Sequence, residues 1–438
     1  MARLMSESAL KANLRVLSEQ AIQRVAADDR PLEYFAGATA MLDMRRDQAI
    51  TELPGFEEAR TALGSLPLVQ EHYGAGDTPD GEHAWERLTL QFVYGFLAKL
   101  PEPTFDPATF EATWEAFWEE LATPEWTWFC MANLRNFRSE SNLIEIADGV
   151  TIRGRSFEEL ARMGWSAWHL GQLEREWYEG GVNSSHVILV EHKVPKTPDN
   201  FVGNEIVTQA TAFRALLAMR LLKQGDIGLG RLWFLRRDAF SLGLLGNYST
   251  GFSGGFMPGS QYTLNEVEST SLRELYNNLV RYEGERDNAP VNLDLALAFF
   301  SNAFDHRGAL VYYTRLVDNV TALEALLGTT VEISFRLSAK VAGILANDDD
   351  ERVAIYNQVR DYYDTRSRVV HGEPLKAKHS QYLTDYETLQ GLPRRLLVGF
   401  IRLTISPGST FGKTFFRERL DNTLLHSTRR SELRVAMT

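Results

Sequence analysis

The sequence predicts an α+β protein that is mostly α-helical. Apolar residues recur at three- and four-residue steps through most of the chain, as they do along one face of a helix. Alternation of apolar and polar residues, the pattern of half-buried strands, is confined to the middle of the chain. The polar, turn-rich segment Gly284–Pro290 is typical of a boundary. We therefore expect a mixed α/β region over residues 1–285 and an all-helical region over residues 290–438.

Composition indicates the class of protein. Hydrophobic residues make up 44% and charged residues 24% of the 438 positions, as in a folded chain with one large core or several smaller ones. Cys130 is the only cysteine, so no disulfide can form within the chain. The N-terminal segment carries scattered charges, unlike a signal peptide, and no apolar run approaches the roughly 18 residues that cross a bilayer. We expect a soluble, cytoplasmic protein that does not bind membranes.

The net charge of −12 argues against indiscriminate binding to nucleic acid, because the long-range field repels phosphate. The charge is uneven. Residues 394–438 hold nine basic residues against three acidic ones, a net charge of +6 that leaves −18 for the rest of the chain. Two interpretations of this basic segment stay open: it docks on the acidic surface of the protein or of a neighbouring subunit, or it forms a local rim that attracts phosphate.

The first part of the chain is expected to be helical. The apolar spacing of residues 1–100 predicts helices, which the proline-rich segment Pro101–Pro107 ends. The helix after it places Phe110, Trp114 and Trp118 on one face. Such a stripe can stack bases or sugars, but large aromatic side chains at this spacing usually fill an interior, and we expect them to be core.

The middle of the chain changes to the two-residue period of strands. Alternating residues flank Asp148 and Gly149, a strong signal for a two-residue hairpin. A capping box at Ser156 and Glu159 then predicts the start of a helix. Two more strands are expected at residues 184–194 and 230–240, and a helix is expected between them at residues 210–225.

Two features precede the boundary. The segment Gly251–Gln261 is rich in glycine, but it lacks the Gly-Lys-Ser/Thr ending of a P-loop and the spacing of a dinucleotide fingerprint. We expect a surface loop there rather than a phosphate cradle. A second capping box, at Ser271 and Glu274, predicts the start of the helix that follows the loop.

The segment Tyr362–Pro374 ends one of the helices expected after Pro290. Arg366 lies on the apolar stripe of that helix, where an unpaired guanidinium is costly to bury, so it requires a carboxylate, a partner subunit or a ligand. His371 follows about 140° further round the helix. The two side chains can converge if the helix loosens before Gly372 or if the length of the arginine spans the gap. A plain helix end explains the same residues, because the helix dipole favours a histidine in the last turn and glycine is the usual cap.

Three segments give this helix end a wider context. They are LVDNVTALEALLG, EISFRLSAKVAGIL and, most specifically, YDTRSRVVHG. Together, over about residues 290–400, they resemble the Apea-like branch of the HEPN superfamily. The resemblance implies a helical bundle that dimerises and, in many members, acts as a metal-independent ribonuclease with an Arg-x4–6-His motif. Arg366 and His371 match that motif with four intervening residues.

The chemistry that the resemblance implies suits these residue types. RNA carries its own nucleophile, the 2′-hydroxyl, so cleavage needs a proton acceptor near neutral pH and a cation that stabilises the crowded phosphorane. Histidine titrates in that range, and arginine presents a rigid, permanently charged fork to phosphate oxygens. By analogy, a homodimer would place two histidines and two arginines around one scissile phosphate and leave a 2′,3′-cyclic phosphate and a 5′-hydroxyl. No metal or other cofactor is expected.

Two residues are expected to support the motif. Ser367 either positions Arg366 or a phosphate, or is an ordinary exposed serine. Glu324 falls within a mostly apolar stripe, where pairing with Arg366 or Arg336 would explain it. The other polar candidates are expected to be structural, exposed or part of an interface: Asp364, Arg368, His379 and His306.

These observations support two functions. The first is a metal-independent RNA endonuclease that acts as a regulated effector in bacterial anti-phage defence or stress response. Residues 1–285 would then sense a protein or small-molecule trigger. The alternative is a non-catalytic module, in which the HEPN-like region drives dimerisation or binds RNA or a nucleotide while the N-terminal region recognises another protein.

Overall fold

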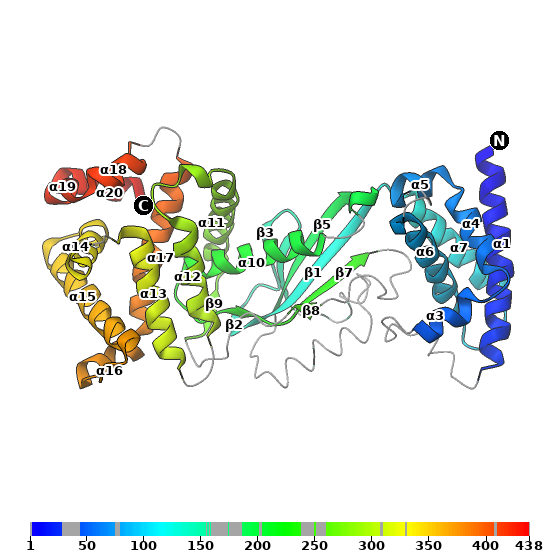
Figure 1. The fold of residues 1–438 in the computed structure, drawn as a ribbon, viewed down its shortest axis with the longest axis horizontal. Coiled ribbons are helices and arrows are strands. Elements are labelled where there is room, and N and C mark those ends of the chain that lie inside the picture. The colour runs from blue at the N-terminus through cyan, green and yellow to red at the C-terminus, as the bar shows by residue number, and fades with distance from the viewer. Residues whose placement is uncertain are drawn as a thin grey trace.

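The computed structural model describes residues 2–28, 44–74, 79–154, 156, 158, 174, 186–200, 204–237, 249–250, 260–306, 310–328, 331–406 and 410–437. Within these residues the chain is mostly α-helical with one main antiparallel sheet, which confirms the predicted α+β, mostly α, fold class. Three parts follow one another along the long axis of the molecule (Figure 1): N-terminal helices, the sheet, and C-terminal helices.

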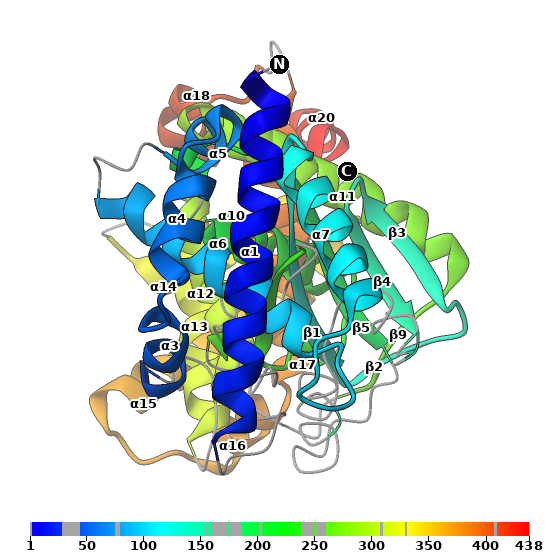
Figure 2. The same cartoon turned by 90° about the vertical axis from the view of Figure 1, so that its right-hand side faces the viewer.

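The N-terminal helices pack around a core of their own. They are α1 (Ala2–Ala26), α3 (Met44–Thr51), α4 (Phe56–Gly64), α5 (Pro67–Tyr73), α6 (Pro79–Leu97) and α7 (Pro107–Ala122). Figure 2 shows α1 lying lengthwise across the other helices, and it packs against α4 and α6. Phe110 and Trp114 are buried in this core, and the half-buried Trp118 stacks on Trp114 with 5.5 Å between ring centroids. The predicted core role of the aromatic stripe is confirmed.

The sheet has the strand order β3-β4-β5-β1-β7-β8, with β6 paired to β1, and every pairing in it is antiparallel. Its strands are β1 (Glu125–Arg135), β3 (Leu143–Ala147), β4 (Val150–Gly154), β5 (His186–Pro195), β6 (Gly228–Leu229), β7 (Leu232–Arg237) and β8 (Ser249–Thr250). A short parallel pair joins β2 (Phe137–Ser139) to β9 (Tyr262–Leu264). The predicted hairpin is confirmed: Gly149 takes a φ of +67°, and a Cβ there would meet the carbonyl oxygen of Glu191 at 2.3 Å.

Helices α10 (Asn204–Leu222) and α11 (Glu266–Gly284) follow the predicted order, but α11 starts earlier than expected. Its N-cap is Asn265, whose side chain accepts a hydrogen bond from the backbone N–H of Glu268 while the Glu268 carboxylate accepts one from Asn265. The predicted start at Ser271 is wrong, because Asn265 comes directly after β9 and offers the first cap. The predicted helix after Ser156 and residues 251–259 of the glycine-rich segment lie outside the described residues.

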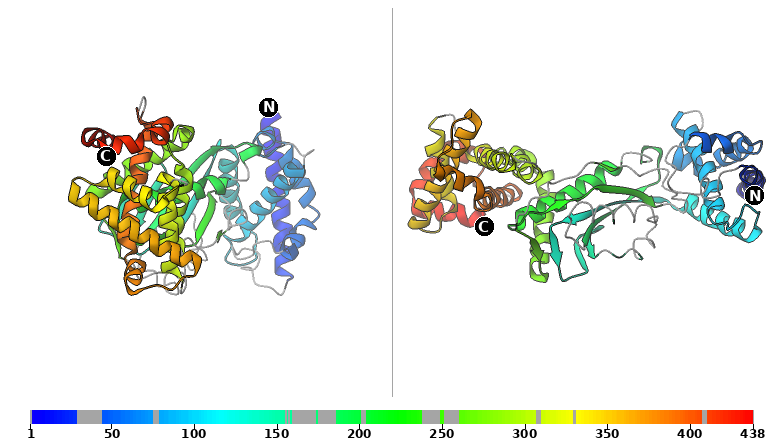
Figure 3. Two further views of the ribbon diagram at one scale, coloured as in Figure 1. Left: turned by 60° about the vertical axis from the view of Figure 1, so that its left-hand side comes forward. Right: turned by 90° about the horizontal axis from the view of Figure 1, so that it is seen from below.

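After Pro290 every secondary-structure element that the structure describes is a helix, as predicted. The helices are α12 (Leu293–Asp305), α13 (Val311–Leu327), α14 (Ile333–Leu345), α15 (Asp349–His371), α16 (Ala377–Thr384), α17 (Tyr386–Ile405), α18 (Lys413–Glu418), α19 (Leu420–Leu425) and α20 (Ser427–Met437). Short 3-10 helices occur at Pro198–Asn200 and Arg286–Asn288. Figure 3 shows these helices at the end of the molecule opposite α1, with the sheet between them.

One buried cluster joins the sheet to the C-terminal helices. It extends from Cys130 on β1 through α10 and α11 to Met437 on α20. Buried ion pairs cross the same junction: Arg315 on α13 binds Asp226 with 3.0 Å between Nη2 and Oδ1. The predicted division between residues 1–285 and 290–438 stays a prediction, since the two regions share this core.

The structure contains no helix, among the residues that it describes, with the length and apolar composition of a membrane span.

Candidate functional site at the end of helix α15

Helix α15 carries the predicted motif in its last two turns. Its first turn is set by the Asp348 side chain, which accepts a hydrogen bond from the backbone N–H of Glu351, and by three acidic residues that favour a helix N-terminus. Its end is set by Gly372, which takes the left-handed φ of +68°. The N–H of Glu373 then bonds the carbonyl of Arg368 at 2.8 Å. The helix is continuous to His371, so the loosening considered from the sequence does not occur.

Arg366 is held half-buried against a neighbouring helix. Its Nη2 lies 3.1 Å from Oε2 of Glu324 on α13, and the two side chains are 23% and 21% exposed. Of the two partners considered for Glu324, the structure pairs it with Arg366. Arg336 Nε instead lies 3.9 Å from Oε2 of Glu332. Arg366 Nε is buried and has no hydrogen-bond partner among the described residues, so Glu324 engages the guanidinium through Nη2 alone.

Glu324 is positioned by the end of α13. The residues around it on that helix, Leu323, Leu326 and Leu327, are buried, which places the carboxylate at the margin of the core. Burial raises the pKa of Glu324, although the positive charge of Arg366 acts in the opposite direction. The helix is capped by Gly328, whose N–H bonds the carbonyl of Glu324 at 2.7 Å.

His371 differs from His306 and His379, two other histidines of this helical region. Its side chain is exposed at the last helical position and makes no hydrogen bond or ion pair with any residue that the structure describes. His306 pairs with Asp318, and His379 is 1% exposed and pairs with Asp364. His371 is therefore accessible to a ligand or a partner subunit, while His306 and His379 have the structural roles expected from the sequence.

Helix α16 is fixed to α15 beside the motif. The Nδ1 atom of His379 accepts the backbone N–H of Lys376 at 3.0 Å, so Nε2 carries the proton and donates to Asp364 Oδ2 at 3.0 Å. Tyr382 on α16 donates to Asp361 at 2.8 Å. Arg368 bonds Glu373, with 3.0 Å between Nη1 and Oε2. The contacts to Asp361 and Asp364 hold α16 against the helix turn that precedes Arg366.

Ser367 is half-buried and makes no side-chain hydrogen bond within the described part of the chain, so its supporting role stays a prediction. Among the described residues no three His, Cys, Asp or Glu side chains are grouped so as to hold a metal ion.

No family model, curated protein or solved structure matches this chain. The family suggested by the resemblance therefore stays a prediction. The function has to be argued from the residues at the end of α15.

A second charged site was only partly visible in the sequence. Of the nine basic residues in the C-terminal segment, four arginines line a single cavity formed by α10, α11, α14, α17 and α20. The excess of positive charge in that segment was the available signal. The convergence of four arginines on one cavity could not be deduced from the sequence, because it depends on how five helices are placed relative to one another. These arginines are Arg394, Arg395, Arg402 and Arg434.

Proposed function

We propose that this protein is a metal-independent RNA endonuclease in which Arg366 and His371 are catalytic. The observation that carries the proposal is the different environment of the two motif residues. Arg366 is held by Glu324 through Nη2, whereas His371 is exposed and unpaired within the described residues. A phosphate-binding cation has to be held in place, and a general base has to reach its substrate.

The reaction follows from these residue types. His371 takes the proton of the 2′-hydroxyl, whose oxygen attacks phosphorus as the bond from phosphorus to the 5′-oxygen breaks. Arg366 stabilises the negative charge that develops on the phosphorane oxygens. The leaving 5′-oxygen takes a proton from a second imidazolium. The products are a 2′,3′-cyclic phosphate and a 5′-hydroxyl.

The second histidine has to come from another copy of the chain. Base and acid act on opposite sides of the phosphorus, while the motif of one chain supplies one histidine. Within one chain, Arg366 and His371 are separated by five residues, about 7.5 Å along α15 and about 140° around it. A homodimer in which the two α15 ends face each other would complete the site.

The biological role proposed with this activity is that of a regulated effector in bacterial anti-phage defence or stress response. The N-terminal helices form a separate core far from α15 (Figure 1), which suits a part that senses a protein or small-molecule trigger.

The test compares purified full-length wild type with His371→Ala and Arg366→Ala on total RNA. We expect His371→Ala to lower cleavage by about 10²–10⁴-fold and Arg366→Ala by about 10²–10³-fold. Two matched controls should cleave like wild type: His426→Ala, an exposed histidine at the end of α19, and Arg360→Ala, an exposed arginine on α15. Ends that carry a cyclic phosphate would identify the nucleophile. Equal cleavage by all five proteins would refute the proposal, and so would intact RNA both in this assay and in phage-challenged bacterial cells that express wild type.

A non-catalytic module is the second candidate, and one observation favours it. Val370, next to His371, is 52% exposed, and a dimer interface at this helix end would bury it. In this case the helical region would serve dimerisation or RNA binding alone. Val370→Asp should then convert a dimer to a monomer by light scattering while no variant affects RNA integrity. For the endonuclease, loss of the dimer and loss of cleavage should coincide.

A further inference from the structure

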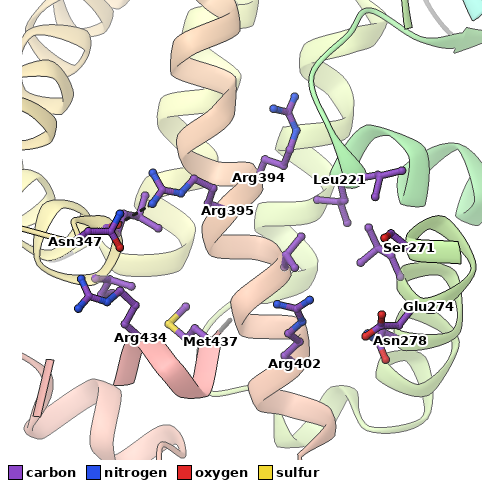
Figure 4. A pocket seen from close by; sticks show the side chains of 15 residues that line it. Leu221, Ser271, Glu274, Asn278, Asn347, Arg394, Arg395, Arg402, Arg434 and Met437 are labelled. Atoms are coloured by element: carbon purple, nitrogen blue, oxygen red, sulfur yellow. Dashed lines mark hydrogen bonds between the residues drawn. The ribbon is translucent and has the colours of Figure 1, made fainter. Parts of the chain in front are cut away.

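A cavity of about 380 Å³ lies between helices from both sides of the predicted boundary at residues 285–290. Helices α10 and α11 form one side, and α14, α17 and α20 form the other (Figure 4). Its wall is partly apolar, with Leu275, Val398 and Met437 among the lining residues. We call this cavity, with Arg394, Arg395, Arg402 and Arg434, the arginine pocket.

Three of these arginines direct charge toward the cavity. Figure 4 shows Arg395 and Arg434 both extending toward Asn347, while Arg402, two turns further along α17 than Arg395, lies toward Asn278. The guanidinium of Arg394 points away from the other three (Figure 4). It is buried, its Nε donates to the carbonyl of Arg220 at 2.9 Å, and burial lowers its pKa to about 10. Arg394 therefore adds to the positive field but not to the contacts.

The end of α14 holds two of the arginines in position. Arg395 Nη2 donates to the carbonyl of Leu345 at 2.7 Å, and Arg434 Nη1 donates to the carbonyl of Ala346. These are C-terminal carbonyls of a helix, where cations are favoured. A guanidinium carries five N–H donors, so each arginine retains donors for a ligand after these bonds.

Capping of α14 does not account for the whole site. Arg402 lies on α17 two turns after Arg395, toward Asn278 on α11 rather than at the end of α14 (Figure 4). Two carboxylates lie near the three arginines: Glu274 belongs to the lining, and Glu351 Oε1 lies 3.8 Å from Arg395 Nη1. The three guanidinium groups therefore keep an excess of one positive charge, and the buried Arg394 adds a second. Positive charge beside an apolar wall suits a ligand with both an anionic and an apolar part.

We propose that the arginine pocket binds a small molecule that carries a phosphate monoester on an apolar or planar body, of the size of a nucleoside monophosphate. Its volume falls in the range of small-molecule sites, about 300–1,000 Å³. A phosphate monoester has a charge of about −1.5 to −2 at neutral pH and three acceptor oxygens, which match the charge and the fork-shaped donors of the lining. The body packs on the wall of Val398 and Met437, and a planar body can also stack on a guanidinium. This proposal is independent of the endonuclease proposal.

Calorimetric titration of the full-length protein at constant ionic strength tests the proposal. The probes are AMP, GMP, CMP and UMP, the four nucleosides that lack the phosphate, and inorganic phosphate. We expect at least one monophosphate to bind with one site per chain, at least 10-fold more tightly than its nucleoside and than inorganic phosphate. Binding of none of the monophosphates would overturn the proposal, and so would equal affinity for inorganic phosphate, which indicates an adventitious ion only.

Variants locate the binding. Arg395→Gln removes an exposed arginine of the lining, and Ser271→Glu adds a carboxylate at an exposed lining position while all arginines stay. Each should weaken the monophosphate at least 10-fold. Arg429→Gln removes the same charge from an exposed position of α20 outside the lining and should change affinity less than 2-fold. Unchanged affinity in both lining variants would overturn the proposal. His371→Ala should bind like wild type, which separates this outcome from a failure of the endonuclease proposal.

Discussion

Replacement of Glu324 by Gln is predicted to lower RNA cleavage without weakening the fold at pH 7. The variant keeps the size of the side chain but removes the charge that faces Arg366 Nη2 at 3.1 Å. Burial raises the pKa of Glu324 above the ordinary value of 4.5 even with Arg366 beside it. Ionisation of this carboxyl is therefore less favourable in the folded chain than in the unfolded one. The charge holds Arg366 in place and does not stabilise the fold.

The pH dependence of stability determines whether Glu324→Gln is more or less stable than wild type at pH 7. Between pH 4.5 and the raised pKa, Glu324 binds more protons in the folded state than in the unfolded state. The free energy of unfolding of wild type therefore falls as pH rises through this window, and glutamine lacks that fall. The raised pKa already includes the attraction of Arg366. Near pH 4 we expect Glu324→Gln and wild type to be equally stable. At pH 7 we expect the variant to be as stable as wild type or more stable by up to about 1 kcal/mol, the range of a partly exposed ion pair.

Two measurements on one preparation check this prediction. Thermal unfolding followed by circular dichroism from pH 4 to pH 8 gives the difference in stability, and cleavage of RNA at pH 7 gives the effect on activity. We expect cleavage to fall about 10- to 100-fold, because a displaced catalytic cation is out of reach of the phosphate. Glu373→Gln removes an exposed carboxylate that pairs with Arg368 and is the matched control. A loss of more than about 1 kcal/mol at pH 7 with unchanged cleavage would refute the reasoning.

Two further predictions concern the fold. Gly372→Ala should lower stability by about 1 kcal/mol, because alanine is strained at the left-handed φ of +68°. Gly284→Ala is the control: a Cβ there is also in open space, but Gly284 has no positive φ, so its replacement should not lower stability. Thermal unfolding of both variants measures the difference. Arg315→Met should destabilise by about 3–5 kcal/mol, since it leaves Asp226 buried without its partner at 3.0 Å. Adding Asp226→Asn should restore part of that loss in denaturant unfolding, and a double variant no more stable than the single one would contradict this account.

Local elements could be predicted because their signals lie within a few residues. The hairpin at Gly149 needs only a residue that tolerates a positive φ between alternating strands. The end of α15 needs only Gly372 after the last apolar positions. The start of α11 was misplaced for the same local reason: Ser271 with Glu274 and Asn265 with Glu268 are both acceptable caps, and only the end of β9 selects the second.

The partner of Arg366 shows how far sequence reasoning extends toward the site. The apolar stripe of α15 required a partner for this guanidinium and left Glu324 paired with either Arg366 or Arg336. Forty-two residues separate Arg366 from Glu324, and only the packing of α15 against α13 brings Nη2 to 3.1 Å from the carboxylate. The burial that raises the pKa of Glu324 is likewise a property of the packed helices.

The sequence by itself determined the elements with local causes: the period of the long helices and of the central strands, the hairpin at Gly149, the glycine that ends α15, and the motif residues Arg366 and His371 on one helix. Only the tertiary structure decided which of these elements share a core, that Glu324 fixes Arg366 while His371 stays exposed, and that four arginines meet at one cavity. The physical reason is range. Backbone dihedrals and caps depend on neighbours within a turn, whereas burial, ion pairs and cavities depend on side chains that the packed helices bring together from distant parts of the chain.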